Sequence, residues 1–265
     1  MPLISSPIYL STMLLEKNRS NGKGPSLLVS DWMEPIGEAG FGGLEIWMNH
    51  LLFSSRSEWE LIREKGLESD LASALIASPL PADDSDKSRR LRDALLEACD
   101  YFRPEGLKLR LPKGEEGVDF LKTWVRDVPR EIAVLCDCAE GEGGVAGLER
   151  LRQALPGGRY RAVIHPFLLP PAEFEAALEA HGDFIGNLGV QARKEKAWAR
   201  IQDDKEASLK IIAVSRRLAY KGTWTLEYTQ GAGQAGEDID KLFDASEADL
   251  NFLAENLART TAEKV

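Results

Sequence analysis

The sequence predicts a single (β/α)8 barrel, the TIM barrel of the α/β class. Eight short runs of β-branched or apolar residues alternate with eight longer amphipathic stretches. Eight strand–helix units in a chain of about 250 residues are typical of this barrel. No change of composition marks a second domain, so residues 1–265 are expected to form one domain. An open doubly wound sheet is the alternative, although such sheets usually have about six strands.

Composition narrows the class of protein. The chain has 265 residues, with 33 Lys and Arg against 43 Asp and Glu, which gives a net charge of −10. This charge argues against a nucleic-acid partner or an anionic membrane surface. No apolar run approaches the roughly 20 residues of a membrane span, and the N-terminus lacks a signal-peptide pattern. The three cysteines are too few for a disulfide framework, so we expect a cytoplasmic protein.

Each predicted strand is a short apolar run bounded by Gly, Pro or charged residues. Their order along the chain leaves room for one helix after each strand, as a parallel barrel requires. The eight predicted strands are Ile8–Leu14, Gly43–Met48, Ala72–Ser78, Gly106–Leu111, Ile132–Cys138, Tyr160–Phe167, Asp183–Gln191 and Thr223–Thr229.

The predicted helices have apolar residues at a spacing of three and four. Ser57 and Glu60 have the spacing of an N-terminal capping box. Pro171 stands where proline is favoured, at the first helical position. Asp238–Phe243 is predicted as a short extra helix before the last one. The eight main helices are Val29–Glu38, Ser57–Lys65, Ser85–Tyr101, Val118–Val128, Val145–Leu155, Pro171–Ala180, Lys205–Tyr220 and Ser246–Ala258.

Two segments are predicted to be long loops. Lys17–Pro25 is rich in Asn, Ser and Gly and follows the first strand, while Gln191–Ala207 is charged and follows the seventh. In a barrel both loops lie at the carboxyl ends of the strands, where active sites are built.

Strand alternation predicts which side chains face the barrel lumen. Successive residues point alternately to the helix layer and to the lumen, and the more apolar set should face the helices. This rule sends ionisable or amide side chains inward from six of the strands, although buried charges are costly unless paired or metal-bound. The alternatives are a parity error on some strands or ion pairs at a solvated mouth. The inward set is Glu45, Lys108, Arg110, Asp137, His165, Gln191 and Glu227.

Three further residues are candidates for substrate contacts at the carboxyl ends. Trp47 can stack on a sugar ring, or simply pack. His50 follows the second strand and can reach the mouth, or cap the next turn. Arg193, in the loop after the seventh strand, can bind a phosphate or carboxylate, or be a solvated charge.

Five segments resemble a known family. They are Gly40–Trp47 (GFGGLEIW), Val134–Cys138 (VLCDC), Ala162–Pro166 (AVIHP), Leu188–Arg193 (LGVQAR) and Thr225–Tyr228 (TLEY). In order and spacing they are similar to strands two, five, six, seven and eight of the xylose isomerase-like TIM barrel superfamily, the sugar phosphate isomerase/epimerase group. The resemblance covers nearly the whole chain.

The resemblance implies one divalent metal ion (Mn, Mg, Co or Zn), held by Glu, Asp, His and Glu. Only Glu227 keeps the ligand type of its matched position. Asp137 is a shorter carboxylate, His165 stands near the position of an aspartate, and Gly189 replaces the histidine. Gln191 offers a neutral oxygen instead. The implied mixed N/O ligand set is therefore Asp137, His165, Gln191 and Glu227.

The resemblance also implies a sugar or sugar-phosphate isomerase or epimerase, which moves a proton at a carbon next to a carbonyl. Asp137 and Glu227 are then the catalytic pair, and members of the group often form homodimers. Substrate contacts are assigned to Glu45, Trp47, His50, Lys108, Arg110 and Arg193.

Two other functions remain open at this point. One is a non-catalytic carbohydrate-binding or partner-subunit barrel that has lost the metal. The other is a metal-free lyase or aldolase in which Lys108 forms a Schiff base.

Overall fold

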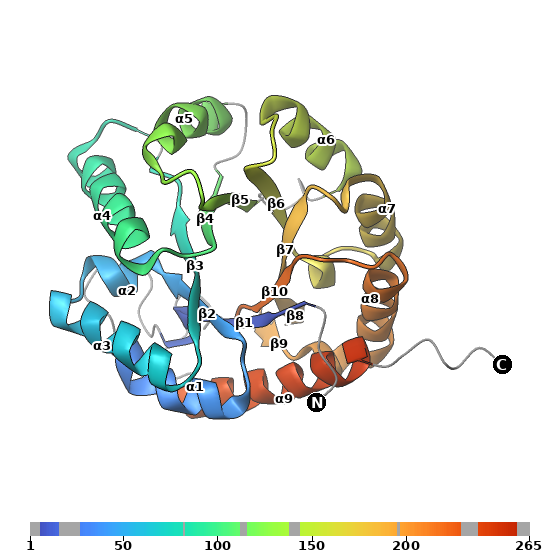
Figure 1. Ribbon diagram of the computed structural model, residues 1–265. Helices are drawn as coiled ribbons and strands as arrows, with labels where there is room; N and C mark the ends of the chain where they lie inside the picture. The colour runs from blue at the N-terminus through green and yellow to red at the C-terminus, as the bar shows by residue number, and fades with distance from the viewer. Residues whose placement is uncertain are drawn as a thin grey trace.

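The computed structural model describes residues 6–15, 27–81, 83–111, 116–137, 144–194, 197–228 and 238–258. Eight parallel strands close into a barrel in the order β1-β10-β7-β6-β5-β4-β3-β2, and the helices surround it (Figure 1). Strand β1 pairs with both β2 and β10, so the sheet has no open edge. The predicted (β/α)8 barrel is confirmed, and the open doubly wound sheet is excluded.

All eight predicted strands are present, most of them shorter than predicted at the carboxyl end. The first one, for example, turns into a 3-10 helix over Thr12–Leu15. Apolar residues continue past the ends of the strands because they still pack on the core, so the pattern alone overextends them. The barrel strands are β1 (Ile8–Ser11), β2 (Gly43–Trp47), β3 (Ala72–Pro79), β4 (Gly106–Arg110), β5 (Ala133–Asp137), β6 (Tyr160–Ile164), β7 (Ile185–Val190) and β10 (Thr223–Leu226).

The outer layer contains the predicted helices with adjusted ends. Pro171 does open its helix. No helix in the described ranges is long and apolar enough to cross a membrane. The main helices are α1 (Met33–Ala39), α3 (Arg56–Glu68), α4 (Asp86–Phe102), α5 (Glu116–Trp124), α6 (Val145–Ala154), α7 (Pro171–His181), α8 (Lys205–Arg217) and α9 (Ile239–Ala258).

Three predictions about local structure were wrong. Helix α3 is capped by Ser55, whose side chain accepts from the backbone N–H of Glu58, and not by Ser57 as predicted. A single helix, α9, replaces the two predicted near the C-terminus, because no Gly or Pro interrupts it. The predicted loop after the seventh strand contains a small hairpin, β8 (Ala192–Lys194) and β9 (Ala197–Ala199), followed by a 3-10 turn.

The core is divided between two layers. The larger cluster lies between strands and helices, and includes Leu44, Ile46 and Leu107. A smaller cluster fills the amino-terminal half of the lumen and consists of Tyr9, Ala74, Leu75, Leu135 and Val163. Each fully buried aliphatic side chain contributes about 1.5–3 kcal/mol. The two clusters confirm the predicted alternation of side chains between the helix layer and the lumen. The polar inward side chains therefore lie in the carboxyl-terminal half of the lumen.

Candidate active site

Five ionisable side chains from five strands meet in the carboxyl-terminal half of the lumen. The register between neighbouring strands sets their height in the barrel. Asp137 is level with Arg110, the last residue of β4, and Glu45 is level with Ser11, the last residue of β1. Four of the five are buried, and His165 is mostly so. The cluster, named the lumen cluster below, consists of Glu45, Lys108, Asp137, His165 and Glu227.

Lys108 is the centre of the lumen cluster. Its Nζ donates to Oε2 of Glu45 at 3.0 Å and to Oε1 of Glu227. Its side chain is only 5% exposed. Burial alone lowers the pKa of a lysine, but the charges of Glu227, Glu45 and Asp137 outweigh it and raise the pKa of Lys108 far above the ordinary value. The ammonium therefore stays charged.

Asp137 and His165 form the second ion pair, with His165 Nε2 3.0 Å from Asp137 Oδ1. Burial lowers the pKa of His165, but Glu227 and the hydrogen bond to Asp137 raise it more strongly. Burial likewise raises the pKa of Asp137, and His165, Lys108 and Arg110 together lower it below the ordinary value. Both shifts favour an imidazolium–carboxylate pair.

Glu45 and Glu227 share the charge of one lysine. Burial and the negative charge of Glu227 raise the pKa of Glu45 more than Lys108 lowers it. Glu227 also faces the histidine, since its Oε2 lies 4.0 Å from His165 Nδ1. The cluster thus presents carboxylate oxygens and two cationic N–H groups within one small volume.

Gly189 makes room for the His165 ring. A Cβ at position 189 would lie 2.5 Å from His165 Nδ1 and 2.8 Å from Glu227 Oε1. His165, which directly follows β6, the neighbour of β7, therefore occupies the space that a side chain at position 189 would need. The sequence shows this glycine on the inward side of its strand, but only the structure shows which ring fills the space.

Gln191 and Arg110 lie next to the cluster, and among the described side chains neither takes part in its ion pairs. Gln191 is buried directly after β7, next to the end of β10, where the Glu227 N–H donates to Val190 O. Arg110 is exposed at the end of β4. The backbone of Arg193 lies in β8, while its side chain falls outside the described part of the structure.

Trp47 and His50 are held by one threonine that sequence analysis missed. Thr12 Oγ1 lies 2.8 Å from His50 Nδ1 and accepts from the Trp47 N–H at 2.9 Å. The two rings pack edge to face, 5.9 Å between centroids. His50 is buried in the short helix α2 (Met48–Leu52), and Trp47 is partly exposed. Thr12 was hidden inside a run predicted as strand, where nothing distinguishes it.

The predicted metal ligands do not fit a divalent ion as they are arranged. Across the described ranges, no three His, Cys, Asp or Glu side chains surround a common point that could hold one. The space between the two glutamates is taken by the Lys108 ammonium. A cation is thus present, but it belongs to the protein.

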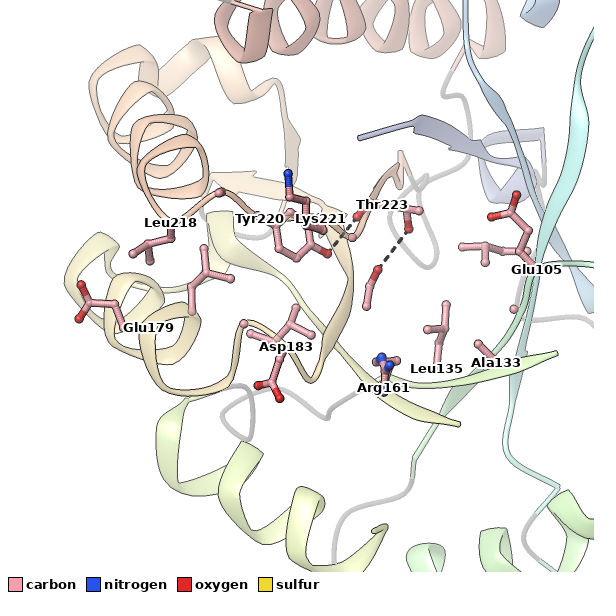
Figure 2. A pocket seen from close by; sticks show the side chains of 18 residues that line it. Glu105, Ala133, Leu135, Arg161, Glu179, Asp183, Leu218, Tyr220, Lys221 and Thr223 are labelled. Carbon is pink, nitrogen blue, oxygen red and sulfur yellow. Dashed lines mark hydrogen bonds between the residues drawn. The ribbon is translucent and has the colours of Figure 1, made fainter. Parts of the chain in front are cut away.

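A large pocket lies at the opposite end of the barrel. It has a volume of about 720 Å³ and is lined by residues at the starts of several strands, among them Gly106, Ala133 and Ile185. Figure 2 shows Arg161 in this pocket, between Asp183 and Leu135 in that view. Since barrel active sites lie at the carboxyl ends, we place the candidate site in the lumen cluster.

Comparisons with solved structures support the same fold. D-psicose 3-epimerase, solved in the presence of D-fructose, superposes with a TM-score of 0.67 and 14% identity, covering 96% of this chain and 100% of that one. A xylose isomerase-like TIM barrel protein from Mycobacterium smegmatis, in complex with magnesium, gives 0.66 and 12%, covering 95% and 98%. The probable 3-DHS dehydratase AsbF from Bacillus anthracis gives 0.68 and 12%, covering 92% and 98%.

No protein-family model and no curated protein sequence matches the chain. The solved structures, at 12–14% identity, show the fold that the resemblance implied, shared over nearly the whole length of these proteins.

Proposed function

We propose that this chain, a barrel of the xylose isomerase-like fold, is an isomerase or epimerase that moves a proton at a carbon next to a carbonyl. The observation that carries the proposal is the lumen cluster, in which two cations and three carboxyl groups are buried at the catalytic end of the barrel. Buried charges of this kind would be an expensive way to stabilise a fold, since apolar residues would serve better. Clusters of perturbed pKa values are typical of active sites.

The geometry supports a division of roles. Glu227 takes a proton from the carbon, and the C–H electron pair moves to the carbonyl oxygen as an enolate forms. Lys108 and the imidazolium of His165 donate hydrogen bonds to that oxygen and stabilise its charge. Asp137 holds His165 in its protonated form. In an isomerisation, Glu227 returns the proton to the neighbouring carbon. In an epimerisation, the protonated His165–Asp137 pair gives a proton to the other face of the same carbon, and Glu227 keeps the one it took.

The substrate is proposed to be a small sugar or sugar phosphate. Trp47 offers a partly exposed indole and Arg110 an exposed guanidinium at the same end of the barrel. Glu45, held by Lys108, lies deeper and can accept from a hydroxyl group. Arg193 and His50 remain proposed contacts, and a homodimer remains a proposal as well.

A Schiff base on Lys108 is disfavoured. Imine formation needs a neutral amine, whereas the neighbouring carboxylates raise the pKa of Lys108 and keep it charged. The lyase or aldolase alternative therefore has no support from this arrangement.

The test is proton exchange from D2O into a panel of ketoses and their phosphates, followed by NMR of the carbons beside the carbonyl. We expect exchange with the wild type and a loss of about 10²–10⁴-fold in Glu227→Gln. Glu105→Gln, an equal change at the opposite end of the barrel, is the matched control and should keep full activity. Unchanged exchange in Glu227→Gln would contradict the assignment. Sugar binding by the wild type without any exchange would instead favour the non-catalytic carbohydrate-binding barrel.

A further inference from the structure

The pocket at the amino-terminal end of the barrel is separate from the lumen cluster. Ala133, at the start of β5, lines the pocket, whereas Asp137, at the end of the same strand, belongs to the cluster. The two positions are about 13 Å apart along the strand, at roughly 3.3 Å per residue. Leu135 and Val163 fill the lumen between the two ends. A ligand in this pocket is therefore out of contact with the proposed catalytic groups.

Leucine side chains form much of the pocket wall. Leu75 and Leu135 belong to the smaller core cluster of the lumen. Leu178 comes from α7, and Leu218 stands at the end of α8. Figure 2 shows Leu218 and Leu135 on opposite sides of the view. A volume of about 720 Å³ is usual for a small-molecule site, and such walls favour a ligand with an apolar part.

The carboxylates that line the pocket already have partners. Each accepts a hydrogen bond from a residue outside the lining, and Arg152 holds Asp183 with two of them, at 2.8 and 2.7 Å. These bonds lower the pKa of Asp183, with a smaller contribution from Arg161. The carboxylates still repel any ligand that carries several negative charges. The three pairs are Asp183–Arg152, Glu179–Arg217 and Glu105–Tyr9.

The two cations that line the pocket form no ion pair with any described carboxylate. Arg161 makes one hydrogen bond within the described ranges, from Nη1 to Tyr160 O at 3.1 Å, so most of its N–H groups are left for a ligand. Its stem lies beside Leu135, since a Cβ at Gly186 would be 2.7 Å from Arg161 Cβ and 3.0 Å from Leu135 Cδ2. Lys221 is exposed between α8 and β10. A guanidinium binds a carboxylate through two parallel hydrogen bonds.

We propose that this pocket binds a small monocarboxylate with an apolar body, at a site separate from the active site. The carboxylate pairs with Arg161, and with Lys221 at the rim, while the apolar body lies against the leucines. A ligand with a single negative charge is favoured, because three carboxylates line the same space. The inference is independent of the proposed function, since no residue of the lumen cluster takes part in it.

The probe is hexanoate, added to the full-length protein with ¹³C-labelled leucine methyl groups. We expect the NMR signals of Leu75, Leu135 and Leu178 to shift, while those of Leu44, in the layer between strands and helices, stay in place. The dissociation constant should be about 1 mM or lower. 1-Hexanol and hexylamine have the same chain length without the negative charge, and should bind at least tenfold more weakly.

The charge of Arg161 is tested by substitution. Arg161→Gln should weaken hexanoate binding at least tenfold and remove the preference over 1-hexanol, because the guanidinium is lost. Lys221→Gln should have a smaller effect, since that ammonium is exposed to water. Arg130→Gln is the matched control and should keep the wild-type affinity, because Arg130 is exposed before β5 and does not line the pocket.

Any of three results would overturn the inference. The first is the absence of a shift at Leu75, Leu135 and Leu178 up to about 10 mM hexanoate. The second is binding of 1-hexanol as tight as that of hexanoate, since the pocket would then recognise the apolar chain alone. The third is a folded Arg161→Gln protein with wild-type affinity. If Arg161→Gln does not fold, the comparison of hexanoate with 1-hexanol on the wild type decides.

Discussion

At the scale of single residues, the lumen cluster depends on a glycine as much as on its charges. His165 can approach Glu227 only because position 189 has no side chain. The sequence indicated that Gly189 faces the lumen, since side chains alternate along a strand. It could not indicate that the ring of a neighbouring strand fills the space. That depends on the register between β6 and β7, which shifts at Ala162 and Val163.

Gly189→Ala should displace the His165 ring and weaken its hydrogen bond to Asp137. We expect a loss of about 1–3 kcal/mol in the free energy of unfolding, as is usual for overpacking, together with reduced activity. Gly158→Ala is the matched control, because a Cβ there has no neighbour within 4 Å and the turn is unstrained. Urea denaturation of both variants measures the difference. Equal stabilities would show that the ring does not need this space.

The Asp137–His165 pair should make stability depend on pH. The pKa of His165 is raised on folding, so its contribution is complete below the ordinary imidazole value and is lost as pH rises through the folded value. The pKa of Asp137 is lowered, so its contribution is lost only as pH falls towards acid. The pair is therefore most stabilising from mildly acidic to neutral pH.

His165→Gln removes the imidazolium and should cost about 1.5–3 kcal/mol at mildly acidic pH, the range for a hydrogen bond to a charged group. The difference from the wild type should shrink as pH rises through the pKa of His165. Chemical denaturation from pH 6 to pH 10 measures it. In an Asp137→Asn background the same substitution should show a smaller pH dependence, because only Glu227 then raises the pKa of His165. A pH-independent difference in the normal background would refute this assignment.

At the scale of elements, helix α9 is tied to the end of β10 through one buried aspartate. Asp249 accepts from the Ile201 N–H at 2.9 Å and from Gln202 Nε2 at 3.0 Å, and also from the Tyr228 hydroxyl. Tyr228 follows Glu227, so this contact anchors the end of β10 that carries a site residue. The helical pattern predicted most of α9, but it did not single out Asp249.

Asp249→Ala should destabilise the fold by about 3 kcal/mol or more, since several buried donors lose one charged acceptor. We also expect weaker activity, because the Glu227 end of β10 is no longer held. Asp244→Ala, an exposed aspartate in the same helix, controls for helix propensity and should change stability by less than about 0.5 kcal/mol. Thermal and urea unfolding compare the two. Similar losses for both variants would mean that Asp249 does not anchor the strand.

At the scale of the whole molecule, the barrel was predictable and the pairing inside the lumen was not. Strand and helix periods are local signals, so eight units and the inward position of Lys108 could be read directly. The choice of Glu45 and Glu227 as its partners depends on three strands far apart in sequence and on a bulge at Leu44 and Glu45. A local pattern contains no information on such contacts.

The central claim is that this barrel transfers protons through the lumen cluster. The positive charges of that cluster come from Lys108 and His165, and not from a metal ion. The most direct measurement is the rate of deuterium exchange into a responsive ketose by protein dialysed against EDTA, compared with the same protein after addition of Mn²⁺. We expect the two rates to agree within about twofold. Exchange that is lost in EDTA and restored by Mn²⁺ would contradict the claim, because a bound metal ion would then be part of the site.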